Sequence, residues 1–280
     1  IRELEDKIGQ TRILGKKVSY EIYDAEGIGS RQEKQLQEMY AQDYDVMLVN
    51  LVEPASAAGV LTDAKDADIP VILFNREIDE KDLKISKNVW YVGTDARAAG
   101  VMQGKLLKDL WKKQSRILDW NGNGMLDYVL VEGEESHFDA IRRTSGFLET
   151  GAELPLNQKG NILAEWKREL AYEKFAALDD EAVQNVEAVI CNNDDMALGV
   201  YDYYKEKNLK LPVIIGINNS EEMHQKIMSG EMYGTIDNKM EDQVMEICRL
   251  MQAILKKDTG SYQKVWYSTP KAIVKAEGTE

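Results

Sequence analysis

Residues 186–219 read VEAVICNNDDMALGVYDYYKEKNLKLPVIIGINN. Two short apolar runs, Val186–Asn192 and Pro212–Ile217, have the length and composition of strands. Between them, Met196–Glu206 repeats its apolar residues with helical spacing. The second run is apolar throughout, as expected for a parallel strand that helices cover on both faces. The stretch therefore predicts a strand–helix–strand unit.

The same alternation continues along nearly the whole chain, which predicts a doubly wound α/β architecture with parallel sheets. It breaks at residues 91–100, YVGTDARAAG, where one strand follows another without a helix. Because the strands are too many for one comfortable sheet, we expect two similar α/β domains joined by hinge strands. Further strands are expected at Val18–Ala25, Asp45–Val52, Pro70–Glu77, Val89–Gly93, Asp127–Glu132, Ile162–Trp166 and Met232–Ile236. Further helices are expected at Arg31–Tyr40, Ser56–Lys65, Ala96–Lys112, Asp139–Leu148, Leu170–Leu178, Glu221–Met228 and Met240–Leu255.

Composition narrows the class of protein. The 280 residues carry a net charge of −14, which disfavours binding to phosphate backbones. A hydrophobic content of 44% is ordinary for a globular protein, and no apolar run approaches the about 20 residues of a membrane span. Cys191 and Cys248 lie in apolar patterns without a CxxC motif, so we expect buried thiols. The chain begins without Met inside an amphipathic pattern (Ile1, Leu4, Ile8), so we expect a processed or truncated start.

Polar residues, asparagine above all, follow the predicted strands at their carboxyl ends, the edge where open α/β sheets bind ligands. An amide offers a donor and an acceptor without charge, which suits the alternating hydroxyls of a sugar. A dinucleotide would instead need a glycine-rich turn such as GxGxxG, which the sequence lacks. The alternative is that these residues form turns and helix caps. They are Asn50, Asn75, Thr94, Glu132, Glu134, Trp166, Asn192, Asn193, Asn218, Asn219, Asp237 and Asn238.

A second motif, DWNGNGMLD at residues 119–127, matches the first nine positions of a calcium-binding loop, with Gly124 at the sharp turn. Position twelve is Leu130, inside a predicted strand, so a bidentate carboxylate has to come from elsewhere in the chain. A plain connection rich in Asn and Gly is the alternative. The expected local ligands are the side chains of Asp119, Asn121, Asn123 and Asp127 and the carbonyl of Met125.

A third group, His137, Asp139 and Arg143, stands at the start of a predicted helix that follows a strand. These side chains can make hydrogen bonds toward a ligand at the sheet edge. One alternative is a capped surface helix with a stray histidine. Another is a catalytic His–Asp pair, but the sequence offers it no GxSxG motif or suitably placed cysteine as a nucleophile. The second histidine, His224, is expected to be a solvated helix residue.

Together these features resemble the galactose/glucose-binding proteins, the periplasmic sugar-binding proteins of bacterial ABC importers. The likeness covers nearly the whole chain, and the calcium loop is its most specific part. Other matching stretches are DAEGIGSRQEKQLQEM (24–39), NLVEPASAAGVL (50–61), PVILFNRE (70–77), YVGTDARAAGVMQGKLL (91–107), HFDAIRRT (137–144), VEAVICNNDDMALG (186–199) and SGEMYGTIDN (229–238).

The resemblance implies the type I periplasmic binding protein fold and a set of ligand residues. The expected domains are residues 1–93 plus 240–270, and 94–239 plus 271–280, which carries the calcium loop. Glu187 would supply the missing bidentate ligand to Ca²⁺. Trp166 would stack on the sugar ring. The implied hydrogen-bonding residues are Asn75, His137, Asp139, Arg143, Asn193, Asn218 and Asn238.

The implied function is binding without catalysis. An extracytoplasmic, monomeric protein, with a signal peptide or lipid anchor, would close its two domains over glucose or galactose and deliver the hexose to an ABC permease or a chemoreceptor. The rival interpretations are the ligand domain of a lac-repressor-like transcriptional regulator and the sensor domain of a kinase.

Two departures from the family pattern stand out. Asn218 occupies a position where the family usually has Asp, which bears on the preferred sugar. The family's first strand, and the following loop with an Asp and an aromatic residue, have no counterpart in residues 1–280. We therefore expect the first domain to need a strand from elsewhere before it is stable and binds sugar fully.

Overall fold

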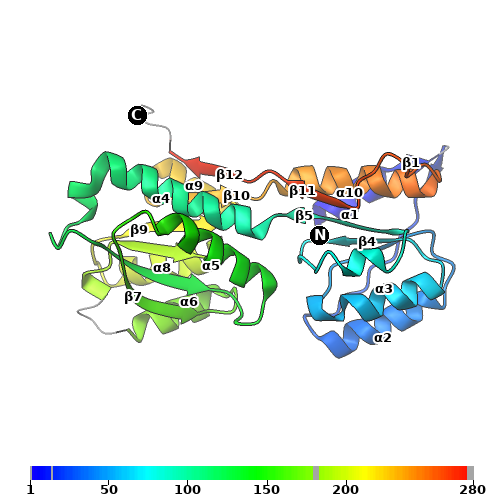
Figure 1. Ribbon diagram of the computed structural model, residues 1–280, viewed down its shortest axis with the longest axis horizontal. Helices are drawn as coiled ribbons and strands as arrows, with labels where there is room; N and C mark the ends of the chain where they lie inside the picture. The colour runs from blue at the N-terminus through cyan, green and yellow to red at the C-terminus, as the bar shows by residue number, and fades with distance from the viewer. Residues whose placement is uncertain (1, 14, 179–182, 276–280) are drawn as a thin grey trace. The chain divides into compact units, whose positions relative to one another are not determined.

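The computed structural model describes residues 2–13, 15–178 and 183–275 (Figure 1). The chain divides into two compact units, each of which holds its own parallel sheet. Unit 1 contains Ile1–Thr94 and Lys239–Ser268, and unit 2 contains Asp95–Asn238 and Thr269–Glu280. The polypeptide therefore passes between the units three times. Two α/β units joined by three crossings are the architecture that the resemblance implies.

Unit 1 has a four-stranded parallel sheet in the order β11-β5-β4-β3. Alternate residues of β4 enter two separate apolar layers: Val71 and Leu73 pack against α2 and α3, whereas Ile72 packs against α1 and α10. Figure 1 shows these helix pairs on opposite faces of the sheet. The strands are β3 (Met47–Val49), β4 (Val71–Phe74), β5 (Val89–Thr94) and β11 (Val265–Ser268). The helices are α1 (Arg2–Gln10), α2 (Gly29–Tyr40), η1 (Pro54–Ser56), α3 (Ala57–Asp66), η2 (Asp82–Lys84) and α10 (Met240–Leu255).

Unit 2 has a six-stranded sheet in the order β12-β10-β9-β8-β6-β7, in which only β12 is antiparallel to its neighbour. On β6, Val129 and Val131 enter one apolar layer while Tyr128 and Leu130 enter the other. The strands are β6 (Leu126–Glu132), β7 (Leu156–Leu163), β8 (Ala188–Cys191), β9 (Val213–Ile217), β10 (Gly234–Asp237) and β12 (Lys271–Val274). The helices are α4 (Ala96–Leu118), α5 (Phe138–Gly151), α6 (Arg168–Ala176), α8 (Asp194–Glu206) and α9 (Glu221–Ser229).

Helix α5 packs unusually close to α4 because glycines remove side chains from the contact. A Cβ atom on Gly100 would lie 1.9 Å from the backbone oxygen of Arg143, and one on Gly146 would lie 2.3 Å from that of Arg97. The close approach sets the position of α5, which begins with two of the predicted ligand residues.

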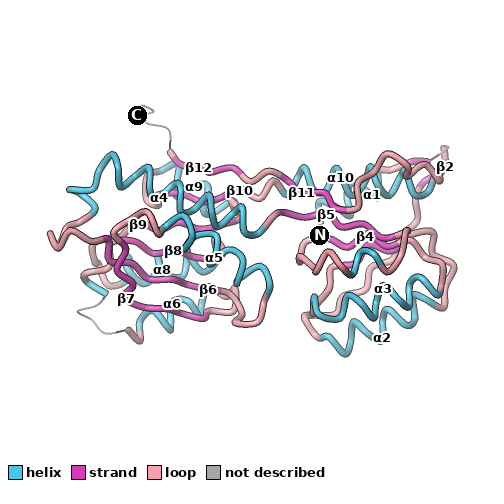
Figure 2. Tube along the Cα trace, in the orientation of Figure 1, coloured by secondary structure: helices cyan, strands magenta, loops and turns pink. Residues whose placement is uncertain are grey.

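The structure corrects several sequence predictions. The expected strand Val18–Ala25 does not form: after the short hairpin of β1 (Arg12–Ile13) and β2 (Lys16–Lys17), the chain runs to α2 as loop (Figure 2). A strand needs a paired neighbour, and no described segment pairs with this one. The expected strand Ile162–Trp166 ends at Leu163, which leaves Trp166 in a turn. The sequence patterns also did not identify β11 and β12 as strands.

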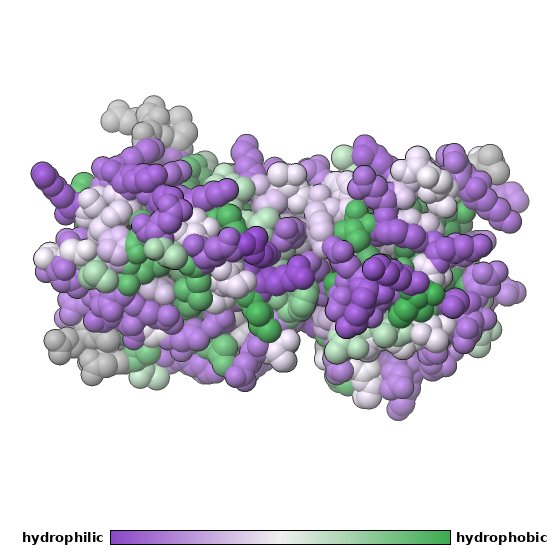
Figure 3. Space-filling model, in the orientation of Figure 1, coloured by the Kyte–Doolittle hydropathy of each residue, from purple (hydrophilic) through white to green (hydrophobic). Residues whose placement is uncertain are grey.

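Other predictions of burial are confirmed. Leu4 and Ile8 of α1 face the core, and Cys191 and Cys248 are buried free thiols. Ile1 lies outside the described residues. Among the helices that the structure describes, none is long and apolar enough to cross a membrane. Hydrophilic side chains cover most of the visible face of both units (Figure 3).

Candidate functional site

The predicted ligand residues of unit 2 gather at one edge of its sheet. Strands β8, β9 and β10 are parallel neighbours, so Asn193, Asn218 and Asn238 follow their carboxyl ends along the same edge. Strands β6 and β7 continue this parallel arrangement, and His137 and Trp166 follow their ends. Topology therefore collects side chains that are far apart in the sequence.

Trp166, which follows the outermost strand β7, makes the most contacts with the other predicted ligand residues: it meets His137, Arg143 and Asn193. Its backbone has a φ of +65°, an unusual conformation for a bulky residue, which turns the half-buried indole toward Gly133. A Cβ atom on Gly133 would lie 2.3 Å from the indole ring, so only glycine fits there. The imidazole of His137 meets the indole edge-on at a centroid distance of 5.0 Å, and the Arg143 guanidinium lies 5.5 Å from the ring centroid. The indole Nε1 is buried, and no described residue accepts its hydrogen.

His137, Asp139 and Arg143 hold one another at the start of α5. His137 is the N-cap residue, and its Nδ1 accepts a hydrogen bond from the Asp139 backbone N–H at 3.2 Å. The neutral ring then carries its proton on Nε2. Arg143 lies one turn later, 3.6 Å from the Asp139 carboxylate, and donates to the Asn192 carbonyl at 2.7 Å. The helix start is capped, as one alternative expects, but the cap is His137 itself and not an Asp, and the same contacts fix all three side chains at the sheet edge.

Asn193 also has a structural role. Its Oδ1 caps α8 by accepting from the Met196 N–H at 3.0 Å, and its Nδ2 donates to the Trp166 carbonyl at 3.1 Å. This second bond ties the loop of Trp166 to β8. Asn218 and Asn238 form a separate pair, in which the Asn238 Nδ2 donates to the Asn218 Oδ1 at 3.0 Å. Asn218 is exposed with a φ of +130°.

Two further residues, Asp194 and Gln103, make buried hydrogen bonds to the segments that carry the asparagines, although the sequence patterns do not identify them for this role. Asp194 accepts from the Thr235 hydroxyl at 2.6 Å and from the Ser220 N–H at 2.7 Å, which joins α8 to the segments after β9 and within β10. Burial raises the pKa of Asp194 to about 6, because a charged carboxylate is poorly solvated there. Gln103 of α4 donates to the Cys191 carbonyl at 2.8 Å. Asp194 follows the end of β8 by three residues, which is the one sequence signal for it, whereas Gln103 lies inside α4 and has no such signal.

Asn75 belongs to unit 1, where it follows β4 with a φ of +67°. Its carbonyl accepts from the Tyr91 hydroxyl at 3.0 Å, and its Nδ2 lies 3.4 Å from Oδ1 of Asn50, which follows β3. Two strand-end asparagines of unit 1 thus lie side by side.

The 119–127 loop is tightly organised by its own oxygens. The Asp119 carboxylate accepts from the N–H groups of Asn123 and Gly124 at 3.0 and 2.9 Å, and Gly122 and Gly124 have φ values of +71° and +78°. Asn123 Oδ1 in turn accepts from the Met125 N–H at 2.7 Å. These bonds and the two positive φ values curl the backbone of the loop around its own carboxylate and amide oxygens.

Glu187, just before β8, reaches this loop from a distant part of the sequence. Its carboxylate accepts from the N–H groups of Asn121 and Asp127 at 3.3 and 2.9 Å. Burial, opposed in part by these hydrogen bonds, raises the pKa of Glu187. Asp127 is buried as well and accepts from the side-chain amides of Asn121 and Asn157 at 3.0 and 2.6 Å. In the part of the chain that the structure describes, no three acidic, His or Cys side chains are already grouped tightly enough to hold a metal.

Comparisons with known proteins find relatives that match most of the chain. Residues 10–259 match the family model described as "Periplasmic binding protein domain". The chain is 31% identical over 251 residues to the D-galactose/methyl-galactoside binding periplasmic protein MglB of Haemophilus influenzae, covering 87% of this chain and 74% of that protein. It is 27% identical to the galactofuranose-binding protein YtfQ of Escherichia coli, covering 84% and 72%. An ABC transporter periplasmic solute binding protein from Actinobacillus succinogenes, solved with bound D-allose, superimposes with a TM-score of 0.81 at 19% identity, covering 98% and 91%.

Proposed function

This chain belongs to the periplasmic binding protein domain family, and from that premise we propose that it binds a sugar outside the cytoplasm and delivers it to an ABC importer. Its role is binding and not catalysis, as in its relatives. The hydrogen-bonding groups at the sheet edge of unit 2 support a polyhydroxylated ligand, because an imidazole, a carboxylate, a guanidinium and amides together match both donors and acceptors on hydroxyls.

One observation carries the sugar assignment: the half-buried indole of Trp166. Its flat apolar ring suits the C–H face of a pyranose, and its buried N–H has no acceptor among the described residues. Around it lie His137, Asp139, Arg143 and Asn193, in contact with the indole, its backbone or one another. Such a plate with a polar border is what a stacked and hydrogen-bonded sugar ring requires.

We propose that the ligand is an aldohexose, D-galactose or D-glucose. The MglB relative binds D-galactose by its name, which supports this choice, whereas the other two compared proteins bind galactofuranose and D-allose. Asn218 and Asn238 would bind further hydroxyls, and Asn75 of unit 1 would be an additional ligand. A chemoreceptor is a second candidate recipient of the loaded protein. A lipid anchor or a cleaved signal peptide would suit an extracytoplasmic location.

We further propose that the 119–127 loop and Glu187 bind Ca²⁺. The donors fit a hard cation: oxygens of Asp119, Asn121, Asn123, Asp127 and Glu187, with the Met125 carbonyl, and no nitrogen or sulfur ligand. Asp127 and Glu187 are 2% and 0% exposed, so two carboxylates are buried near each other. Among the described residues, Lys159 is the one cation paired with them, with its Nζ 3.7 Å from Asp127. A bound Ca²⁺ would neutralise that charge and would connect the loop to β8. Its role would be structural, and the sugar would contact the other residues named above.

Titration calorimetry with D-galactose and D-glucose tests the sugar assignment. Trp166→Ala should weaken hexose binding by about 5- to 150-fold, because stacking on an aromatic ring contributes about 1–3 kcal/mol. Trp166→Phe should retain most of the affinity, and Asn208→Gly, at an exposed turn after α8, should match the unmodified protein. Heat from a pentose or an amino acid with none from either hexose would overturn the proposal.

A further inference from the structure

Asn192 is a buried residue that contacts several of the predicted ligand residues of unit 2. It follows β8 directly, and only 1% of its surface is exposed, which leaves almost no area for a ligand to touch. Its backbone N–H donates to the Val131 carbonyl at 2.9 Å, and its own carbonyl accepts from Nη1 of Arg143 at 2.7 Å. The main chain of Asn192 is therefore fixed by β6 and in turn holds the guanidinium.

The side chain of Asn192 makes one hydrogen bond to each end of the segment from Gly133 to Thr144. Its Oδ1 accepts from the Gly133 N–H at 3.2 Å, and its Nδ2 donates to the Thr144 hydroxyl at 3.2 Å. Three of the predicted ligand residues lie on this segment: His137, Asp139 and Arg143. One buried amide thus holds both ends of the loop and the first turns of α5 from which these side chains extend.

The partners of this amide also fix its orientation. The Gly133 N–H can only donate, so it has to meet Oδ1 and not Nδ2. Nδ2 then faces Thr144, whose hydroxyl accepts this bond and donates its own proton to the Glu132 carboxylate at 2.6 Å. A reversed amide would place two donors against each other at Gly133. An amide at Asn192 and a hydroxyl at Thr144 are therefore both needed to complete this chain of hydrogen bonds.

Two contacts of Asn192 lead to the Trp166 indole. Gly133, which donates to the Asn192 side chain, is the residue against which the indole packs, since a Cβ atom there would lie 2.3 Å from the ring. Arg143, which donates to the Asn192 carbonyl, has its guanidinium 5.5 Å from the ring centroid. A displacement of Asn192 would therefore move two neighbours of the indole together.

We propose that Asn192 is a positioning residue for ligand binding, whose amide holds Arg143 and the backbone beside the Trp166 indole in the geometry that binds the sugar. It acts through these groups and does not contact the sugar. The inference rests on the proposed function and adds to it the residues that fix the binding groups in the free protein. Groups that are already fixed lose little conformational freedom on binding, so the hydrogen-bond chain through Thr144 should increase affinity.

Substitutions at Thr144 test the chain in calorimetry of the whole 1–280 protein with D-galactose. Thr144→Val replaces the hydroxyl with a methyl group and leaves the Asn192 Nδ2 without this acceptor, so affinity should fall by about 5- to 10-fold. Thr144→Ser keeps the hydroxyl and should stay within about 2-fold of the unmodified protein. Ser145→Ala removes an exposed hydroxyl from the next position of α5 and should have no effect.

Asn192→Asp tests the amide itself. The new side chain keeps an acceptor for the Gly133 N–H but has no donor for Thr144, so D-galactose affinity should fall by about 10-fold or more. Because a buried carboxylate can also prevent folding, the comparison of Thr144→Val with Thr144→Ser decides the proposal if this variant does not fold.

Nuclear magnetic resonance of the isotope-labelled protein without sugar tests positioning independently of the ligand. Thr144→Val should shift or broaden the resonances of the Trp166 indole N–H and the Arg143 Nε–H, whereas Thr144→Ser and Ser145→Ala should leave them in place. Unchanged backbone amides of β12 in all three variants would show that the fold is intact.

These two measurements separate the positioning role from the sugar assignment. If neither hexose binds to the unmodified chain, the proposed ligand is wrong, but the resonances of the free protein still test the role of Asn192. Unchanged Trp166 and Arg143 resonances in Thr144→Val would overturn the inference. An equal loss of affinity in Thr144→Ser would overturn it as well, because the hydroxyl would then not be what matters.

Discussion

At the scale of single residues, the candidate site depends on side chains with two tasks. Asn193 caps α8 and holds the Trp166 loop, and His137 caps α5 beside the indole. A residue that is already fixed by the fold loses little conformational freedom when it binds a ligand, so these structural bonds favour affinity. The capping alternative and the binding interpretation are therefore compatible for the same side chains.

Asn218→Asp tests the departure from the family at this position. The Asn238 Nδ2 already donates to the Asn218 Oδ1, and a carboxylate would keep that bond and offer a charged acceptor to a sugar hydroxyl. Because a charged hydrogen bond is worth about 1 kcal/mol more than a neutral one, hexose affinity should rise about 5-fold in calorimetry. Asn219→Asp, at the next position, is the control. Weaker binding of every hexose by Asn218→Asp would show that the amide is the better ligand here.

Asp194 should make stability depend on pH. Its folded-state pKa of about 6 exceeds its ordinary value of 3.8, so between these values the folded protein holds a proton that the unfolded chain has lost. Its contribution is fully present below about pH 4 and falls as pH rises to about 6, by up to ~3 kcal/mol. Denaturant unfolding from pH 4 to 7.5 should show this loss relative to Asp194→Asn. Asp195→Asn, at an exposed neighbour whose charge is the smallest contribution to the raised pKa, should keep most of the loss; parallel curves for all three proteins would contradict the prediction.

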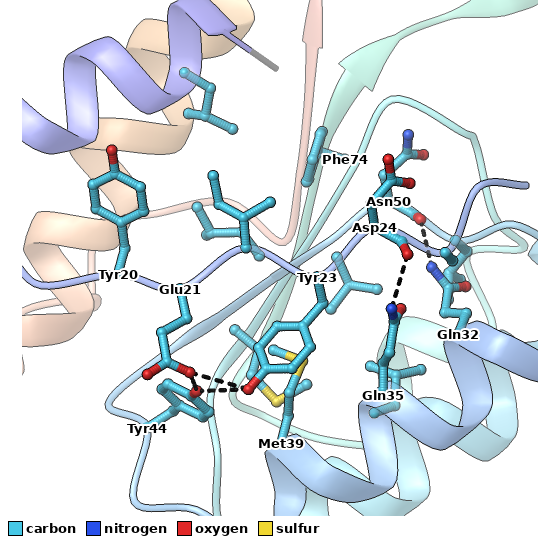
Figure 4. Close-up of a pocket in the computed structure, with 18 of the residues that line it drawn as sticks. Tyr20, Glu21, Tyr23, Asp24, Gln32, Gln35, Met39, Tyr44, Asn50 and Phe74 are labelled. Carbon is cyan, nitrogen blue, oxygen red and sulfur yellow. Dashed lines mark hydrogen bonds between the residues drawn. The ribbon is translucent and has the colours of Figure 1, made fainter.

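At the scale of elements, the position of α5 depends on glycines, which have no side chain at its contact with α4. The close contact at Gly100 and Gly146 sets the position of α5 and therefore of Asp139 and Arg143 in its first two turns. In unit 1, by contrast, no described strand pairs with the Val18–Ala25 stretch, and it forms a loop despite its strand-like residues (Figure 4). Element positions thus follow from partners more than from local propensity.

Gly100→Ala should disturb the site through α5. The added Cβ would lie 1.9 Å from the backbone oxygen of Arg143, so the two helices must separate, and such overpacking costs about 1–3 kcal/mol of unfolding free energy. Hexose affinity should fall with it because Arg143 moves. Gly59→Ala on α3, where no atom lies within 4 Å of the new Cβ, should be neutral or stabilise by about 0.5–1 kcal/mol. Equal stability of the two variants in denaturant unfolding would show that α5 tolerates displacement.

At the scale of the whole molecule, the chain builds two units with separate apolar cores, and the 119–127 loop that we propose to bind Ca²⁺ belongs to unit 2. Unit 1 has the smaller of the two main sheets, so fewer hydrogen bonds between strands stabilise it. The two units therefore need not share one stability.

Chelation should act on unit 2 alone. A ligand at 100 times its dissociation constant stabilises the folded form by about 2.7 kcal/mol, so removing Ca²⁺ should lower the melting temperature of unit 2 reversibly. Hydrogen exchange during a thermal ramp can follow β8 for unit 2 and β5 for unit 1. Glu187→Gln should lose most of the response to chelator, and Glu173→Gln, on α6, should keep it. An unchanged melting temperature in chelator, together with no metal by elemental analysis, would contradict the proposal that the loop binds Ca²⁺.

The sequence by itself determined the architecture and the general place of the site. Apolar runs on both faces, such as VIIGI at 213–217, allow only parallel strands between helix layers, and parallel strands bring residues such as Asn193 and Asn238 to one edge. Only the tertiary structure decided which of these side chains touch, because the Asn193–Trp166 bond and the Asn218–Asn238 pair join residues from different strands. It also decided that Val18–Ala25 is no strand. That stretch has the residue types of a strand. A strand, however, forms its hydrogen bonds with a neighbouring strand, and the residue pattern of one segment does not show whether such a neighbour pairs with it.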